Sequence, residues 1–288
     1  MYSFSTQSTI ASVIDLSGIE LHNGNFTKLK MLPADVNVGI NFIRKDITDR
    51  DNIIKLTPNS VSSVSNCTSL SNAAGVKIST VEHLLATLSA CGIDNMNIEI
   101  FGGEIPAFDG SAETFLKVIE IAKIKKQSSA RRYVKVLNPI EVSINDSFGI
   151  IEPSNQFELD VTIDFDEKAI GKQNFKIAPN INSFKKNLAS ARTFARLHEV
   201  SSLRASGLSK GGSLENTVVV DEEKILNPEG LRFANEFVRH KTLDLMGDLY
   251  VGGPILGKVI TFKGGHKLNH ALLVALYSSA DSWKFINL

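Results

Sequence analysis

The sequence predicts an α+β fold of two similar domains, each a β-sheet layered on helices, with the helices of the two domains facing each other around a candidate site. The chain has 288 residues, 43% hydrophobic and 22% charged, so it can bury two sizeable cores. Both halves also show the same order of elements: several strands, a helix with metal-ligand residue types, a strand and a further helix. We therefore place the first domain at residues 1–126 and the second at 127–288.

The first half opens with alternating residues that predict a strand over 8–21. Asn23-Gly24 is a strong hairpin signal, and a second strand is expected over 26–32. Apolar residues at helical spacing predict a helix over 80–90. The other elements expected in this half are short strands within 36–57, a strand over 96–100 and a helix over 112–122.

Residues 124–132 are polar and charged without periodicity, and we interpret them as the linker between the domains. In the second half, residues 239–248 predict the helix that organises the candidate site. The Gly/Ser-rich segment 207–213 lacks the residue order of a nucleotide P-loop. The other expected elements are strands over 133–144, 148–152, 157–165, 217–220 and 258–262, and helices over 195–206 and 266–278.

The composition excludes several classes of function. The formal net charge is zero, with 31 residues of each sign and no dense basic cluster, which argues against a nucleic-acid partner. Two cysteines are too few for a disulfide scaffold and favour a reducing compartment. No apolar run approaches the roughly 20 residues that span a bilayer. Residues 1–8 lack the features of a signal peptide, so we expect a cytoplasmic protein.

A candidate metal site combines residues from both halves. Read as a helix, residues 239–248 place His240, Asp244 and Asp248 within roughly an 80° arc. An imidazole and a carboxylate four residues apart can bind one divalent ion, and such ligands suit zinc. His83, in the helix of the first half, is the candidate third ligand. Three protein ligands leave a fourth position for water, as in catalytic zinc sites.

Further residues near these ligands suggest hydrolytic chemistry. Glu82 is adjacent to a ligand and could accept a proton from water, although a capping box with Ser79 is the alternative explanation. A cation must also stabilise the oxyanion or protonate a leaving amine, and His266 and Lys241 are candidates. Two more candidates follow from the same reasoning: Asp248 as the partner that orients His266, and Thr193 as a hydroxyl donor to the carbonyl.

Several short motifs occur in one order along nearly the whole chain, and in combination they are highly specific. They are residues 18–24 (GIELHNG), 79–84 (STVEHL), 92–95 (GIDN), 106–111 (PAFDGS), 190–194 (SARTF), 211–213 (GGS), 226–233 (LNPEGLRF), 236–241 (EFVRHK), Asp244, 247–249 (GDL) and 265–266 (GH). In these motifs the sequence resembles the zinc-dependent UDP-3-O-acyl-N-acetylglucosamine deacetylases of lipid A biosynthesis, a step in making lipopolysaccharide.

The resemblance implies a hydrolase that removes acetate from the sugar nitrogen of a UDP-linked acylated amino sugar. It implies His83, His240 and Asp244 as ligands of Zn²⁺, with Fe²⁺ as the other candidate in the cell. It also implies roles for five residues around the reacting group: Glu82 as general base, His266 as general acid, Asp248 as its partner, and Thr193 and Lys241 as polar groups.

The resemblance further implies that an insert at about residues 195–220 forms an apolar passage for the acyl chain. The residues that match its wall are Phe194, Val200, Leu203, Ser209, Gly212, Ser213 and Val219. Phe165 matches a residue near the uridine. His270 departs from the family pattern, which has Asn there, and we assign no role to it or to His22, which is more typical of a structural residue.

Two other functions remain open at this point. The chain could be a metal-dependent amidohydrolase for another N-acyl substrate, with the same centre and a changed passage. It could instead be a non-catalytic module that binds lipid or nucleotide, with His and Asp residues in structural roles. Acetate release and zinc content distinguish these hypotheses. We expect a monomer, because one chain supplies the whole site.

Overall fold

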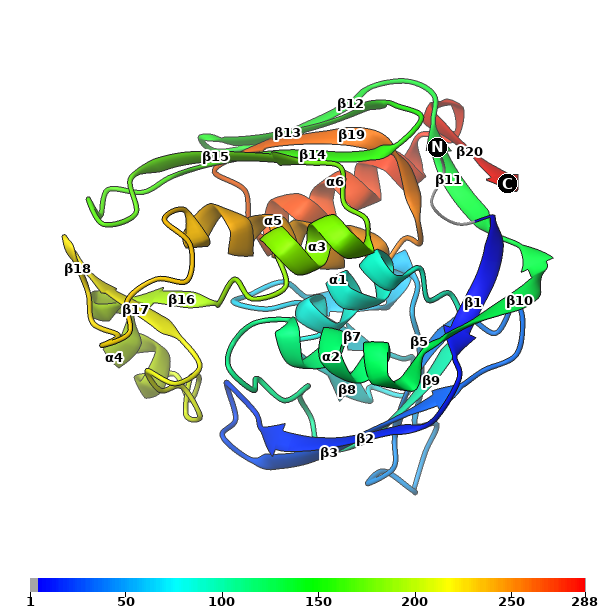
Figure 1. The fold of residues 1–288 in the computed structure, drawn as a ribbon, viewed down its shortest axis with the longest axis horizontal. Coiled ribbons are helices and arrows are strands. Elements are labelled where there is room, and N and C mark those ends of the chain that lie inside the picture. Colours follow the sequence, from blue (N-terminus) through cyan, green and yellow to red (C-terminus); the bar gives the residue numbers. More distant parts are fainter. Residues whose placement is uncertain (1–4, 288) are drawn as a thin grey trace.

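The computed structural model describes residues 5–287, and its two main β-sheets enclose a layer of helices (Figure 1). Residues 1–4, part of the segment expected not to be a signal peptide, lie outside the described residues. The first sheet has the order β2 (Ile14–Ile19), β3 (Phe26–Pro33), β9 (Met96–Phe101), β4 (Ile40–Arg44) and β5 (Ile53–Lys55). This sheet covers one side of the helices.

The second sheet covers the opposite side of the helices (Figure 1). Its main path runs β12 (Ile140–Ile144), β13 (Ser147–Pro153), β19 (Ile255–Phe262), β11 (Arg132–Val136) and β20 (Trp283–Asn287). Strand β14 (Phe157–Asp164) pairs parallel with β19 and antiparallel with β15 (Lys172–Ile177). Each half therefore contributes one of the two main sheets.

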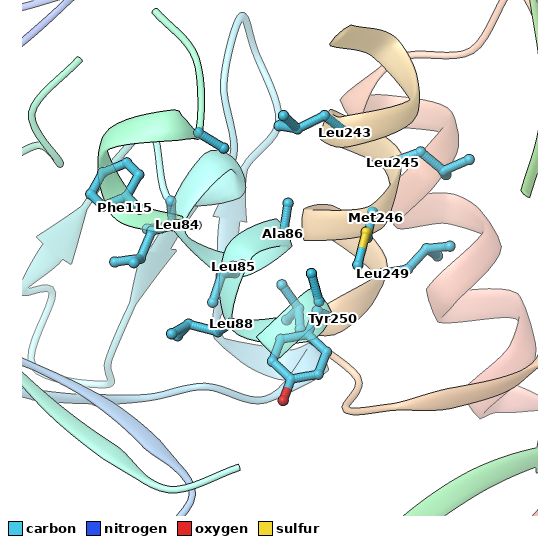
Figure 2. Close-up of a cluster of buried hydrophobic side chains, with 14 of the residues drawn as sticks. Leu84, Leu85, Ala86, Leu88, Phe115, Leu243, Leu245, Met246, Leu249 and Tyr250 are labelled. Atoms are coloured by element: carbon cyan, nitrogen blue, oxygen red, sulfur yellow. The ribbon is translucent and has the colours of Figure 1, made fainter. Parts of the chain in front are cut away.

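The helices of the two halves meet between the sheets. They are α1 (Glu82–Cys91), α2 (Glu113–Ala122), α3 (Ile181–Asn187), α5 (Glu236–Tyr250) and α6 (His266–Ser278). Figure 2 shows apolar side chains of α1, such as Leu85 and Leu88, close to Met246, Leu249 and Tyr250 of α5. All five side chains are buried. The predicted α+β architecture, with helices of both halves facing each other, is confirmed.

A glycine lets α1 and α5 approach closely at the level of the candidate site. A Cβ added to Gly247 of α5 would lie 2.0 Å from the carbonyl oxygen of Glu82 in α1. No side chain fits that gap, so the backbones of the two helices are in direct contact. This contact fixes the first turn of α1 against the second half of the chain.

The predicted insert forms a small subdomain at one edge of the molecule (Figure 1). It consists of β16 (Phe194–Arg196), α4 (Leu197–Ala205), β17 (Val218–Asp221) and β18 (Lys224–Ile225). Its loop reaches the first half, where the amides of Lys210 and Gly211 donate to the carbonyls of His22 (3.1 Å) and Leu21 (3.0 Å). The insert therefore bridges the two layers beside the candidate site.

The structure contradicts the expectation that residues 124–132 form an irregular linker. It forms β10 (Ile124–Ala130), which pairs antiparallel with β1 (Thr6–Ile10). The partner strand lies more than a hundred residues upstream, so the segment's own sequence shows no sign of it. The domain boundary at 126/127 falls within β10 and stays a prediction.

Two expected long strands are each divided in the structure. The 8–21 segment forms β1 and β2, and the 133–144 segment forms β11 and β12. Strands β15 and β20 and helix α3 were not predicted. The remaining short elements are η1 (Pro58–Ser60), β6 (Val61–Ser63), β7 (Ser69–Ser71), β8 (Lys77–Ile78) and η2 (Ala280–Ser282). Among residues 5–287, no helix combines the length and apolar character that crossing a bilayer requires.

Candidate active site

Helices α1 and α5 bring together the three predicted metal ligands. His83 Nε2 lies 3.5 Å from Asp244 Oδ1, and His240 Nε2 lies 3.3 Å from the same oxygen. One nitrogen or oxygen from each residue falls within 4.8 Å of the others, and all three side chains are buried. The two imidazole rings meet edge to face, with centroids 4.9 Å apart. This arrangement confirms that the two distant helices converge.

The three side chains are chemically suited to a divalent cation. Asp244 Oδ1 is buried and has no hydrogen-bond partner among the described residues, which is costly unless a cation fills the gap. Burial lowers the pKa of His240 to about 3, so its imidazole is neutral and can ligate. His240 Nδ1 lies 3.1 Å from the Ala191 carbonyl, which directs Nε2 toward Asp244.

Glu82 is the first residue of α1 and faces the same centre. Burial raises the pKa of its carboxyl to about 7, so the group can exchange a proton near neutral pH. Its Oε2 accepts a hydrogen bond from the backbone amide of Thr68 (3.1 Å). The capping-box interpretation is wrong, because Val81 occupies the N-cap position and no side chain caps the helix. A box needs the acidic residue two positions further into the helix.

His266, at the start of α6, lies opposite Glu82. Its Nε2 is 3.8 Å from Glu82 Oε1, and its Nδ1 is 2.8 Å from Asp248 Oδ2. Burial alone would lower the pKa of His266, but the contact with Asp248 outweighs it and raises the pKa to about 9. Asn269 also donates to Asp248 Oδ2 (2.8 Å), so the partner of His266 is held from two sides. The predicted His266–Asp248 pair is present.

Lys241 and Thr193 complete the polar wall. Lys241 Nζ lies 3.0 Å from Asp244 Oδ2, and this carboxylate raises the pKa of the ammonium against the opposing effect of burial. The Thr193 amide donates to the Gly110 carbonyl (2.8 Å), which fixes Thr193 in the wall. Both residues line the same cavity as the three candidate ligands.

A cavity of about 270 Å³ joins these groups to the insert. The expected residues that line it are Glu82, His83, Thr193, His240, Lys241, Asp244, His266, Phe165, Phe194, Leu203 and Ser209. Four other residues of the expected acyl passage are outside this lining: Val200, Gly212, Ser213 and Val219. Arg196 and Glu199 do contribute to it, so the insert side of the cavity is more polar than expected.

Sequence reasoning missed Thr68, which links the two proton-transfer candidates. Its amide binds Glu82, its hydroxyl donates to Asp248 Oδ1 (2.6 Å), and its Oγ1 lies 3.5 Å from His266 Nδ1. Thr68 lies in the segment 60–72, which is rich in Ser and Asn and has no periodic pattern that distinguishes one hydroxyl from another. Only its position in space shows its importance.

His22 and His270 differ in their surroundings. His22 lines the cavity, and neither of its buried ring nitrogens has a hydrogen-bond partner within residues 5–287. We expected His22 to be an ordinary structural histidine, but a structural role does not explain why these two nitrogens lack partners. His270 lies one turn after His266 on α6, is only partly buried, and is not in the lining of the cavity.

The arrangement of the candidate ligands agrees with the family to which the chain is similar. A family model described as UDP-3-O-acyl N-acetylglycosamine deacetylase matches residues 7–278, nearly the whole chain. The chain belongs to this deacetylase family. The resemblance seen in the sequence motifs is thereby confirmed.

Individual relatives of the deacetylase family match over similar lengths. A protein of Phenylobacterium zucineum (strain HLK1), named UDP-3-O-acyl-N-acetylglucosamine deacetylase, is 43% identical over 279 residues, covering 96% of this chain and 95% of the relative. A protein of the same name from Shewanella frigidimarina (strain NCIMB 400) is 40% identical over 284 residues, covering 98% and 92%. The similarity therefore spans both sheets and the insert.

Proposed function

We propose that this protein hydrolyses the N-acetyl group of UDP-3-O-acyl-N-acetylglucosamine, giving UDP-3-O-acyl-glucosamine and acetate. Membership of the deacetylase family supports this substrate. The observation that carries the proposal is the convergence of His83, His240 and Asp244 around a buried carboxylate oxygen that has no hydrogen-bond partner among residues 5–287. Such a centre beside Glu82 and His266 suits amide hydrolysis.

His83, His240 and Asp244 would hold a divalent cation, with Zn²⁺ as the first candidate and Fe²⁺ as the second. A zinc ion bound there supplies Lewis acidity, which lowers the pKa of water to about 7 and polarises a carbonyl. The protein keeps His240 neutral by burial, which leaves its Nε2 lone pair free for ligation. The neighbouring Lys241 offsets the negative charge of Asp244.

Glu82 acts as the general base. As water attacks the acetyl carbonyl carbon, Glu82 takes the water proton, which its pKa of about 7 allows at neutral pH. His266 acts as the general acid: it donates its proton to the sugar nitrogen as the carbon–nitrogen bond breaks. Asp248 keeps His266 protonated for this step, and Thr68 fixes the positions of Asp248 and Glu82 through hydrogen bonds to both.

The remaining expected residues have substrate-binding roles in this proposal. Thr193 and Lys241 donate hydrogen bonds to the reacting carbonyl and the sugar. Phe194, Leu203 and Ser209 of the insert contact the acyl chain near the cavity, and Phe165 lies near the uridine. Val200, Gly212, Ser213 and Val219 would contact more distant parts of the acyl chain.

We infer a cytoplasmic enzyme that acts as a monomer. Both cysteines, Cys67 and Cys91, are buried and free, which suits a reducing compartment. One chain supplies all the residues proposed for the metal, the base and the acid, so no second subunit is needed to complete the site.

Acetate release and zinc content, measured on one preparation, test the proposal. We expect acetate from UDP-3-O-acyl-N-acetylglucosamine and one zinc ion per chain. Turnover of other N-acetyl sugars without turnover of this substrate would support the alternative amidohydrolase. The absence of both zinc and acetate release would contradict an enzymatic role and leave the binding-module hypothesis.

A further inference from the structure

Glu104, just after β9, is completely buried beneath the wall of the cavity. Four neutral donors converge on its carboxylate. Oε1 accepts from the Thr80 hydroxyl (2.8 Å) and the His22 amide (3.0 Å), while Oε2 accepts from the amide (3.1 Å) and side chain (3.2 Å) of Asn23. An ionised carboxylate only accepts hydrogen bonds, so it satisfies all four donors.

These donors belong to two walls of the cavity. His22 lies in the turn between β2 and β3, and Thr80 immediately precedes the first turn of α1, two residues before Glu82. Both residues line the cavity. Glu104 is therefore a single anchor between the His22 turn and the segment that presents Glu82.

The Thr80 backbone needs such an anchor. Its φ is +57°, a left-handed conformation that β-branched residues rarely adopt. Strained residues of this kind persist only where their surroundings hold them, and they concentrate at functional sites. The hydroxyl bond to Glu104 supplies one restraint on Thr80. The backbone bond from the Ile105 amide to the Ser79 carbonyl (3.0 Å) supplies another next to it.

We propose that Glu104 is a positioning residue for catalysis: through Thr80 and His22 it fixes Glu82 at the correct place in the cavity. This inference rests on the proposed function of Glu82. Among residues 5–287, the side-chain hydrogen bonds of Glu104 go to His22, Asn23 and Thr80 and not to Glu82, so Glu104 would act on the base indirectly, by positioning it. The rate constant of the chemical step should depend on Glu104 more than substrate or metal binding does.

The substitution Glu104→Gln tests this role, because it keeps the size of the side chain. The glutamine NH₂ group would face at least one of the four donors, and the anchor would loosen. We expect kcat to fall about 100-fold, the cost of a misplacement of about 1 Å, while KM and zinc content stay near wild type. In the metal-free protein, amide hydrogen exchange should accelerate in peptides covering residues 20–25 and 79–84.

Asp94→Asn is the matched control for a general loss of stability. Asp94 is a largely buried carboxylate away from the cavity, which accepts from the Ser8 amide (3.0 Å) and Arg131 Nε (2.8 Å). This variant should lower the melting temperature and leave kcat and exchange at residues 79–84 unchanged.

Thr80→Val provides a second test if Glu104→Gln fails to fold, because it removes only the hydroxyl. We expect a kcat loss of about tenfold for Thr80→Val, intermediate because the two amide bonds to Glu104 remain.

The double variant Glu104→Gln/Thr80→Val should be no slower than Glu104→Gln alone, because the Thr80 hydroxyl acts only through its contact with Glu104. Wild-type kcat in Glu104→Gln or Thr80→Val, with a lowered melting temperature only, would overturn the inference. Fully additive losses in the double variant would overturn it as well. A wild-type protein that releases no acetate would instead refute the proposed function, and the exchange experiment would then decide the role of Glu104.

Discussion

At the scale of single residues, Glu82 and His266 have opposite requirements for their protons. The base must be deprotonated, and the pKa of Glu82 is raised to about 7 by burial. The acid must be protonated, and Asp248 raises the pKa of His266 to about 9. We therefore predict a bell-shaped dependence of kcat/KM on pH, with activity rising through about pH 7 and falling through about pH 9. A profile without the alkaline limb would contradict the role of His266.

Substitution of the base and of a ligand should have different consequences. Glu82→Ala should keep the metal and lose about 10²–10⁴-fold in activity, the usual contribution of a general base. His240→Ala should lose both the metal and the activity, because it removes a metal ligand. Metal analysis and acetate release on each variant check this, with Glu113→Gln on α2 as a control outside the cavity lining. Full turnover by Glu82→Ala would show that another group is the base.

At the scale of elements, the contact of α1 with α5 depends on Gly247. Alanine there would force the helices apart, since its Cβ would lie 2.0 Å from the Glu82 carbonyl oxygen. We expect Gly247→Ala to destabilise the protein by about 1–3 kcal/mol, despite the roughly 1 kcal/mol gained in helix propensity. The midpoint of urea unfolding measures this change.

The same displacement should weaken zinc retention, because His83 and Asp244 lie on the two helices that separate. Ser89→Ala, on the partly exposed side of α1, introduces the same residue without a clash and should leave both properties unchanged. Tight zinc binding and unaltered stability in Gly247→Ala would mean that the helices accommodate the methyl group. The close helix contact would then have no role in assembling the site.

The elements show where sequence reasoning succeeds. The apolar stripe of α1 and the four-residue spacing of His240 and Asp244 are local patterns, so both helices and the ligand pair could be predicted. The pairing of His83 with that ligand pair is a long-range contact: the residue type and helix of His83 made it a candidate, and the family resemblance implies the same ligand. Thr68 and Glu104 were missed because their hydrogen bonds join segments that lack periodicity. Strand β10 was missed because its partner β1 is distant in sequence.

At the scale of the whole molecule, a metal should stabilise the fold, because its ligands come from both halves. Free zinc at 100 times its dissociation constant would add about 2.7 kcal/mol to the free energy of unfolding. The melting temperature should therefore rise with zinc and fall with a chelator. In Asp244→Ala the melting temperature should not depend on zinc, and a persistent dependence would place the ion elsewhere.

The distribution of the site along the polypeptide also affects when the protein becomes active. Glu82 and His83 precede β9, whereas His266 begins α6, the last long helix of the chain. A ribosome must therefore release the whole segment from α1 to α6 before the proton donor can meet the proton acceptor. We expect nascent chains and products clipped before α6 to be inert toward the nucleotide sugar, so that catalysis begins only after α6 has been synthesised.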